Sequence, residues 1–283
     1  MTGMASILHP TDFSTASANA FVHALAFALR FQSQLTLLHV GPDDEEEVAW
    51  TQFPAVRRTL ALWGVLEEGQ SHKEVLTALN LGVKKVALRG NNPTPVILDY
   101  MTRHPMDLMV LATHGREGLP RWMHRSVAEP LARRSQTMTL FVPQASRGFV
   151  SLQEGRLSFE RVLVPIDHQP RPEAAIDAGT HLVRKLGLGP VAFELLHVGA
   201  TATMPDVYLP QDPAWSWART HRPGEVVEGV LHTARETAAD LIVMVTAGHE
   251  GVLDALRGST TEQVLRQAPC PVLAVPSAWM PLG

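Results

Sequence analysis

Apolar residues follow two patterns along this chain. Unbroken apolar runs, such as residues 108–112 and 241–245, predict strands that are buried on both faces of a sheet. Apolar residues spaced three and four apart over residues 18–29 and 175–186 predict amphipathic helices, and Ser14 is a suitable N-cap for the first of them. Because strands and helices alternate, we expect a parallel α/β sheet with right-handed crossovers.

The whole pattern occurs twice. Matching segments recur in the same order in both copies: Ile7–Asp12 and Val162–Asp167, Leu37–Val40 and Leu195–Val198, Asp107–Val110 and Asp240–Val243, and Phe141–Pro143 and Ala274–Pro276. The offset between partners is 155 for the first pair, 158 for the second and 133 for the last two. Ordered similarity of this kind indicates a duplicated domain. Because the offset falls, the first copy carries about 25 additional residues within residues 41–106, in and around its third strand.

We therefore predict two α/β domains of the Rossmann-like or flavodoxin-like type. They span residues 1–145 and 159–283, with a linker over residues 146–158. Ligands of such sheets bind beyond the carboxyl ends of the strands, at the switch point of the strand order. The candidate site residues are therefore those that follow the strands.

An aspartate follows the first strand of each copy, Asp12 in the first and Asp167 in the second. A carboxylate at this place can accept a hydrogen bond from an adenine amino group or from a ribose hydroxyl. The alternative is that Asp12 caps the following helix, since aspartate is common at helix starts. The residues alone leave both interpretations open.

A glycine-bearing loop follows the fourth strand of each copy and leads to a helix that opens with Ser-x-x-Glu, at residues 126–129 and 259–262. Free backbone N–H groups and the helix dipole make such a start suitable for an anion. Gly258 would let a phosphate approach the backbone, and Ser259 or Thr260 could donate hydroxyl hydrogen bonds. Plain helix capping is the alternative. The loop is not a Walker A motif, because no lysine follows the glycine.

Together these segments resemble the universal stress protein family. The resemblance rests on Pro-Thr-Asp after the first strand, Leu-Leu-His-Val in the second, Gly-Ser at a helix start and the closing segment Ala268–Pro276. It covers nearly the whole chain, and the two copies are similar to the tandem-domain branch of the family. It implies two five-stranded parallel sheets flanked by helices and packed as an internal pseudo-dimer. In that pseudo-dimer Thr139–Val142 would pair with Pro271–Val275.

ATP-binding members of that family carry a glycine, two residues, a second glycine, nine residues and then Gly-Ser or Gly-Thr. Neither copy here has the complete pattern. Arg125 would bring a long side chain to the phosphates or pair with one of them, and Val245 replaces the glycine near the ribose. The second copy keeps Gly258-Ser259 and is favoured for the phosphates, while the two aspartates with Val40 and Val198 would line the adenine side. The resemblance thus implies two sets of nucleotide-binding residues. The set in the first copy is Asp12, Val40, Ala112, His114, Gly115, Arg125 and Ser126. The set in the second copy is Asp167, Val198, Val245, Gly248, Gly258, Ser259 and Thr260.

Composition removes several other function classes. The chain has 283 residues, 24 basic and 28 acidic side chains and a net charge of −4, which argues against a broad nucleic-acid-binding surface. No apolar stretch approaches the roughly 18 residues of a membrane-spanning helix, and the first residues lack the order of a secretory signal. The single cysteine, Cys270, excludes an intramolecular disulfide and is expected to be a buried structural thiol. We expect a cytoplasmic protein that meets neither nucleic acid nor membrane.

Thirteen histidines raise the hypothesis of a metal site, but no His-Glu-x-x-His motif or close His/Cys grouping occurs. His39 and His197 occupy matched positions in apolar strands and are expected to be hydrogen-bonded core residues. Four tryptophans fall after the second strand of either copy and are expected to pack, or else to cover a cleft: Trp50, Trp63, Trp215 and Trp217.

These observations and the resemblance together imply a stress-response regulatory protein that binds ATP or another adenine nucleotide, with or without Mg²⁺, in at least one domain and without efficient catalysis. We assign no catalytic residue and no metal ligand. Two alternatives stay open: an interaction protein whose pockets have decayed, and a slow ATPase, which lacks an identifiable base. Beyond the nucleotide, the expected partners are a protein that the sequence does not identify and, as an option, a second copy of the chain.

Overall fold

The computed structural model describes residues 5–43, 49–66, 79–113, 128–146, 148–246 and 260–280 of the chain. In the first half, strands and helices alternate within these bounds: β1 Ser6–Pro10, α1 Thr15–Phe31, β2 Gln34–Gly41, α2 Val56–Leu62, β3 Gly82–Arg89, α4 Pro93–Arg103, β4 Leu108–Thr113, α5 Ala128–Ser135 and β5 Met138–Pro143. The second half repeats the alternation: β6 Arg161–Pro165, α6 Glu173–Leu186, β7 Val191–Val198, the short 3-10 helix η1 Thr201–Thr203, β8 Trp215–Arg222, α7 Val226–Glu236, β9 Leu241–Thr246, α8 Thr260–Leu265 and β10 Val272–Pro276. The predicted α/β architecture is confirmed.

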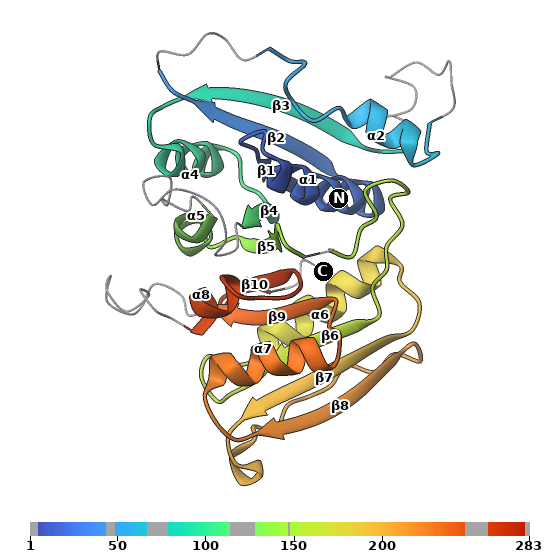
Figure 1. The fold of residues 1–283 in the computed structure, drawn as a ribbon, viewed down its shortest axis with the longest axis vertical. Coiled ribbons are helices and arrows are strands. Elements are labelled where there is room, and N and C mark those ends of the chain that lie inside the picture. Colours follow the sequence, from blue (N-terminus) through green and yellow to red (C-terminus); the bar gives the residue numbers. More distant parts are fainter. Residues whose placement is uncertain are drawn as a thin grey trace.

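Among the described residues, ten strands form one sheet in the order β3-β2-β1-β4-β5-β10-β9-β6-β7-β8 (Figure 1). Neighbouring strands are parallel within each half, and the central pair, β5 and β10, is antiparallel. Each half therefore has the strand order third, second, first, fourth, fifth. This order places a switch point beside the first strand of each half, as in Rossmann-like units.

Helix α1 forms because its local sequence supplies both a start and a buried face. Ser14 is its N-cap, and the hydroxyl oxygen of Ser14 accepts a hydrogen bond from the N–H of Ser17 at 3.2 Å. Phe21 and Leu25 lie on the buried face. The helix ends where Gln32 takes the left-handed conformation with φ of 50°. The predicted helix and its N-cap are confirmed.

Helices cover both faces of the sheet (Figure 1). Helices α1, α2 and α6 contribute buried apolar residues to one face, and α4, α5, α7 and α8 contribute to the other. Successive strand residues enter different cores, so Ile7 of β1 belongs to the first and Leu8 to the second. Each core contains residues from both halves, which makes the hydrophobic interior continuous across the molecule.

The two halves join through their last strands. Three residue pairs face one another there: Phe141 and Val272, Leu140 and Leu273, and Thr139 and Ala274. All of these side chains are buried. The predicted pairing, and with it the internal pseudo-dimer, is confirmed. Because each strand fills the open edge of the other, neither apolar edge is left exposed at the centre.

The additional residues of the first copy lie between β2 and β3. Residues 42–81 join these two strands, whereas only residues 199–214 join β7 and β8. The described part of the longer connection contains α2, and it places Phe53, Val56 and Leu60 in the core. The predicted insertion is confirmed, and its position narrows to the segment before the third strand.

Three of the four tryptophans pack against the protein. Trp215 and Trp217 lie in the edge strand β8 rather than in a loop, and both rings contact Phe193. Trp63 follows α2 and donates its Nε1–H to the carbonyl of Leu152 at 3.1 Å. The packing interpretation therefore holds for these residues.

Residues 144–160 join β5 to β6. Val150 and Leu157 form an antiparallel bridge in this segment. Phe149 and Phe159 are buried and meet edge to face, with their ring centroids 4.9 Å apart. The connecting segment is thus anchored to the core by Phe149 and Phe159. The domain boundaries assigned from the sequence stay a prediction.

Candidate functional site

The carboxyl edge of each half gathers the ends of neighbouring parallel strands. In the first half β1 lies between β2 and β4, and in the second half β6 lies between β7 and β9. The chain passes from β1 to β2 on one side and later returns to β4 on the other side. Residues just beyond β1, β2 and β4 are therefore adjacent at the switch point, where ligands of such sheets bind.

Asp12 lies two residues beyond β1 with an exposed side chain. Its Oδ1 accepts a hydrogen bond from the backbone N–H of Ser14 at 3.0 Å. Because Ser14 rather than Asp12 is the N-cap of α1, the carboxylate is held in a short turn just before the helix. An exposed carboxylate in this position can still accept hydrogen bonds from a ligand.

Asp167 occupies the matched place in the second half, but its surroundings differ. Its Oδ1 accepts a hydrogen bond from the N–H of the next residue, His168, at 2.7 Å. Helix α6 begins at Glu173, six residues after Asp167, whereas α1 begins three residues after Asp12. The two aspartates therefore do not present their carboxylates in equivalent ways.

The matched histidines of the second strands hold the loops that carry these aspartates. The Nδ1–H of His39 donates to the carbonyl of Thr11 at 2.8 Å, and that of His197 donates to the carbonyl of Ile166 at 3.3 Å, because a carbonyl can only accept. His197 is buried and His39 is half-buried. Both are hydrogen-bonded structural residues, as predicted.

Val40 and Val198 end the second strands and are half-buried. Each packs against the core on the face of the sheet that α4 and α7 cover. Val198 also lies close to Gly229 of α7, where an added Cβ would come within 2.7 Å of the valine Cγ2. These side chains are packing residues that stay partly exposed at the edge.

Ala112 and Val245 lie one residue before the ends of β4 and β9. Ala112 is half-buried and Val245 is buried at 9% exposure. Thr260 is the exposed first residue of α8. The structure thus brings Asp12, Val40 and Ala112 to neighbouring strand ends of the first half. Seven sequence-predicted site residues lie outside the described residues: His114, Gly115, Arg125, Ser126, Gly248, Gly258 and Ser259.

Sequence reasoning missed a group of buried polar side chains behind Asp12. We call His9, Thr11 and Ser17 the polar cluster; all three are buried. Burial lowers the pKa of His9 to about 4, so its imidazole is neutral at pH 7. A comparison of the two copies contains the signal, because the offset of 155 aligns His9 with Val164 and Thr11 with Ile166.

The part of the chain that the structure describes was also searched for a metal site, a membrane-spanning helix and a reactive thiol. It holds no group of three or more His, Cys, Asp or Glu side chains arranged to bind a metal ion. No helix in it combines the length and apolar character needed to cross a membrane. Cys270 is buried, and burial raises the pKa of its thiol to about 12, which leaves it protonated and unreactive at neutral pH.

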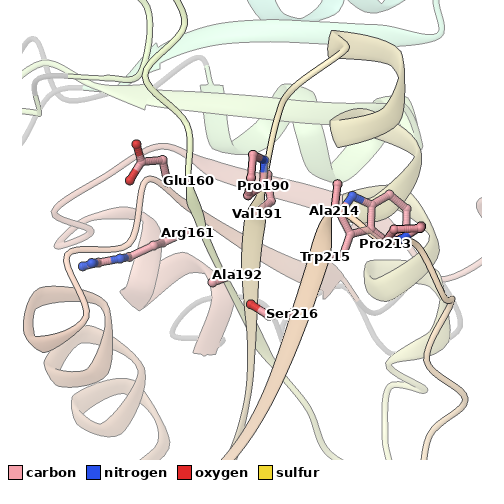
Figure 2. Close-up of a pocket in the computed structure, with 9 residues that line it drawn as sticks. All are labelled: Glu160, Arg161, Pro190, Val191, Ala192, Pro213, Ala214, Trp215 and Ser216. Carbon is pink, nitrogen blue, oxygen red and sulfur yellow. The ribbon is translucent and has the colours of Figure 1, made fainter.

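A cavity of about 360 Å³ lies at the opposite edge of the second half, at the amino ends of β6, β7 and β8 (Figure 2). Its lining consists of Glu160, Arg161, Pro190, Val191, Ala192, Pro213, Ala214, Trp215 and Ser216. The guanidinium of Arg161 already donates to the carbonyl of Thr237 at 2.7 Å, and Arg184 covers the ring of Trp215. None of the sequence-predicted site residues lines this cavity, which leaves the carboxyl edge as the candidate site.

The sequence was compared with models of known protein families. Residues 4–143 and 216–276, more than half of the chain, match the model of the universal stress protein family. The chain belongs to this family. One matched segment lies in each half, so the resemblance to tandem-domain members is confirmed for this universal stress protein, and with it the stress-response class.

Two solved structures resemble this universal stress protein over nearly their whole length. A universal stress protein from Archaeoglobus fulgidus has a TM-score of 0.58 at 18% identity, covering 96% of this chain and 98% of the other. A protein of unknown function from Pseudomonas aeruginosa has a TM-score of 0.64 at 14% identity, covering 97% of this chain and 93% of the other. At these identities the likeness concerns the fold. No curated protein matches the sequence.

Proposed function

We propose that this universal stress protein is a regulatory protein that binds an adenine nucleotide, with ATP as the first candidate, at the carboxyl edge of its first half. The observation that carries the proposal is the exposed Asp12 carboxylate, fixed at the switch point by the N–H of Ser14. Such a carboxylate accepts hydrogen bonds from the amino group of adenine or from ribose hydroxyls. Half-buried Val40 and Ala112 lie at the neighbouring strand ends, on opposite faces of the sheet, and add apolar atoms to this edge.

The first half supports a nucleoside better than the second half does. Asp12 is tied to a residue that caps the adjacent helix, which fixes the carboxylate relative to α1. Asp167 is tied only to its own neighbour, His168, in a longer loop. A preorganised acceptor loses less conformational entropy on binding than one in a longer loop.

The phosphates would extend toward the loops after the fourth strands. The sequence pattern supports Gly115, Arg125 and Ser126 for this role in the first half. Gly258 and Ser259 would serve a nucleotide bound in the second half. Mg²⁺ would arrive with the nucleotide, bound to its phosphates rather than to a cage of protein ligands.

We propose binding rather than turnover because, among the described residues, three side chains that could exchange protons are buried. His9 and His23 are fully buried with pKa values lowered to about 4, and the Cys270 thiol is buried as well. Nucleotide binding would then regulate a partner by favouring one conformation over another, to the extent that the nucleotide distinguishes the two. The cytoplasm, where ATP is plentiful and a single cysteine stays reduced, is the proposed location.

The test is calorimetric titration of nucleotide-free protein with ATP, together with mass spectrometry of any nucleotide that copurifies. We expect Asp12→Ala to weaken ATP binding about tenfold or more, as the loss of a hydrogen bond to a charged group predicts. The matched variant Asp167→Ala should change affinity less than about twofold. Absence of both a copurified nucleotide and heat at millimolar ATP would contradict the proposal and favour an interaction protein. A larger effect of Asp167→Ala would move the site to the second half.

A further inference from the structure

The polar cluster connects strand β4 to the loop that carries Asp12. The Nδ1 of His9 lies 2.9 Å from the carbonyl of Val110 on β4, and its Nε2 lies 3.3 Å from the hydroxyl oxygen of Ser17. The hydroxyl oxygens of Ser17 and Thr11 are 2.8 Å apart. At the end of the series, the backbone N–H of Phe13 donates to Oγ1 of Thr11 at 3.1 Å.

One arrangement of hydrogens satisfies the whole series. The carbonyl of Val110 only accepts, so the Nδ1 of neutral His9 carries the proton and its Nε2 must accept. The hydroxyl of Ser17 then donates to Nε2, and the hydroxyl of Thr11 donates to Ser17. This leaves Oγ1 of Thr11 free to accept from the N–H of Phe13. Every buried donor then has an acceptor, which is the condition for a buried polar group to stabilise a structure.

The second half lacks these side-chain hydrogen bonds, so it can be compared with the first half to judge their effect on the turn. The matched residues there are Val164 and Ile166, and the third position of α6, which corresponds to Ser17 in α1, is Ala175. All three are buried apolar core residues.

The backbone of the loop is held alike in both halves. The N–H groups of Thr11 and Ile166 donate to Leu38 and Leu196 carbonyls, both at 2.8 Å. Two features differ: the side-chain attachment to Phe13, and the three additional residues that separate Asp167 from α6.

That attachment matters because the turn after Asp12 is strained. Phe13 takes a left-handed conformation with φ of 61°, which costs a residue with a side chain about 1 kcal/mol. The bond from Phe13 N–H to Thr11 Oγ1 offsets this cost and directs the next N–H, that of Ser14, onto the Asp12 carboxylate. In the second half, where such a hydroxyl is missing and the loop is three residues longer, Asp167 bonds to His168 instead.

We propose that His9, Thr11 and Ser17 are positioning residues of the first-half nucleotide site, which hold the turn so that the Asp12 carboxylate stays preorganised for the nucleoside. The proposal rests on the proposed function for its ligand, but its structural part concerns the turn alone. Neither His9 nor Ser17 touches the ligand in this arrangement, since both are buried behind the loop.

The experiment compares Thr11→Val, which removes the hydroxyl at nearly constant volume, with Thr11→Ser, which keeps it. Thr139→Val is the matched control, because Thr139 is also buried and its hydroxyl donates to the carbonyl of Thr137 at 2.8 Å, away from the turn. Amide exchange of Phe13 and Ser14, measured by NMR on the full nucleotide-free chain, should be about tenfold faster in Thr11→Val and unchanged in the other two variants. The proposal would be overturned if these two amides exchanged faster in Thr139→Val, or if their exchange rate in Thr11→Val were unchanged.

Titration with ATP supplies the second readout. Thr11→Val should weaken binding about fivefold to tenfold, and His9→Val, which installs the residue of the second half, should do the same. In an Asp12→Ala background neither change should weaken binding further, because their effect passes through Asp12. An equal loss in that background would overturn the positioning role. If the unmodified chain binds no ATP, the proposed function fails, and amide exchange alone decides whether the cluster holds the turn.

Discussion

The Nε2 atom of His23 accepts a hydrogen bond from the backbone N–H of Phe149 at 3.2 Å. The Nδ1–H of the same ring donates to the carbonyl of Asn19 at 2.8 Å, so both nitrogens of this buried residue have partners. The rings of His23 and Phe149 also meet edge to face at 4.7 Å. The middle of α1 is thereby bonded to the segment that connects the two halves of the molecule.

Buried histidines make the stability of this protein depend on pH. The pKa values of His9 and His23 are lowered from 6.5 to about 4 by burial, so the unfolded chain takes up protons before the folded one does. With respect to these two groups, the free energy of unfolding should therefore be highest above pH 6.5. It should fall as the pH drops toward 4, by up to about 3 kcal/mol for each histidine. Urea unfolding across this range measures the slope.

A variant isolates the contribution of one histidine. His23→Leu should be less stable than the unmodified chain at neutral pH but should lose less stability on acidification. If His23→Leu shows the original slope, burial of this side chain does not cause the pH dependence.

Gly155 is predicted to tolerate no side chain. It has φ of 61°, and an added Cβ would lie 2.3 Å from Cδ2 of Trp63. Gly187 has φ of 62° and open space around the same position, so it serves as the matched control. Gly187→Ala should lower the free energy of unfolding by about 1 kcal/mol, the cost of the left-handed conformation, and Gly155→Ala by about 2–4 kcal/mol, since overpacking adds to it. Equal losses in chemical denaturation would show that Trp63 moves aside without cost.

The thiol of Cys270 should react with a disulfide reagent only when the chain unfolds. It is buried, and its pKa is raised to about 12, so almost no thiolate forms near pH 8. Release of the coloured product should be slow in native buffer and rapid in denaturant. Rapid labelling of the native protein would mean that the strand around Cys270 opens readily.

The paired strands at the centre should make the two halves unfold together. Leu273 is fully buried opposite Leu140, so Leu273→Ala should destabilise the protein by about 2–5 kcal/mol. Tryptophan fluorescence and far-ultraviolet circular dichroism should still report one coincident transition, because both hydrophobic cores span the two halves. Separate transitions for the two probes would refute this coupling.

The repeat offsets predicted much of the fold, because matched apolar segments in one order allow few arrangements of a duplicated domain. They placed the insertion and led, through the resemblance, to the pairing of Leu140 with Leu273. The rise of the offset from 155 to 158 also has a structural meaning. The three additional residues lie in the loop between Asp167 and α6, since α1 begins at Thr15 and α6 at Glu173. This difference and the polar cluster of the first half together distinguish the two aspartates.

The repeat offset marks the polar cluster only as a difference between the copies, and it does not show which atoms these side chains contact. His9 sits in a short apolar run, and its partner Val110 is 101 residues away in sequence. A local pattern cannot show whether a polar side chain in such a run has a distant acceptor, and burial without one would be costly. The residues proposed to bind phosphate also depend on the sequence pattern alone, because the loops with Gly115 and Gly258 lie outside the described residues.

The antiparallel pair β5–β10 has a consequence for how this protein behaves when it is scarce. Had the two halves been separate chains, their association would follow mass action, and dilution would separate them. Joined in one chain, they meet at an effective concentration that does not depend on the number of molecules in the cell. A second copy of the chain cannot use the same strands, because β5 and β10 already occupy each other's edges. The protein can therefore keep its two unequal halves paired at any expression level.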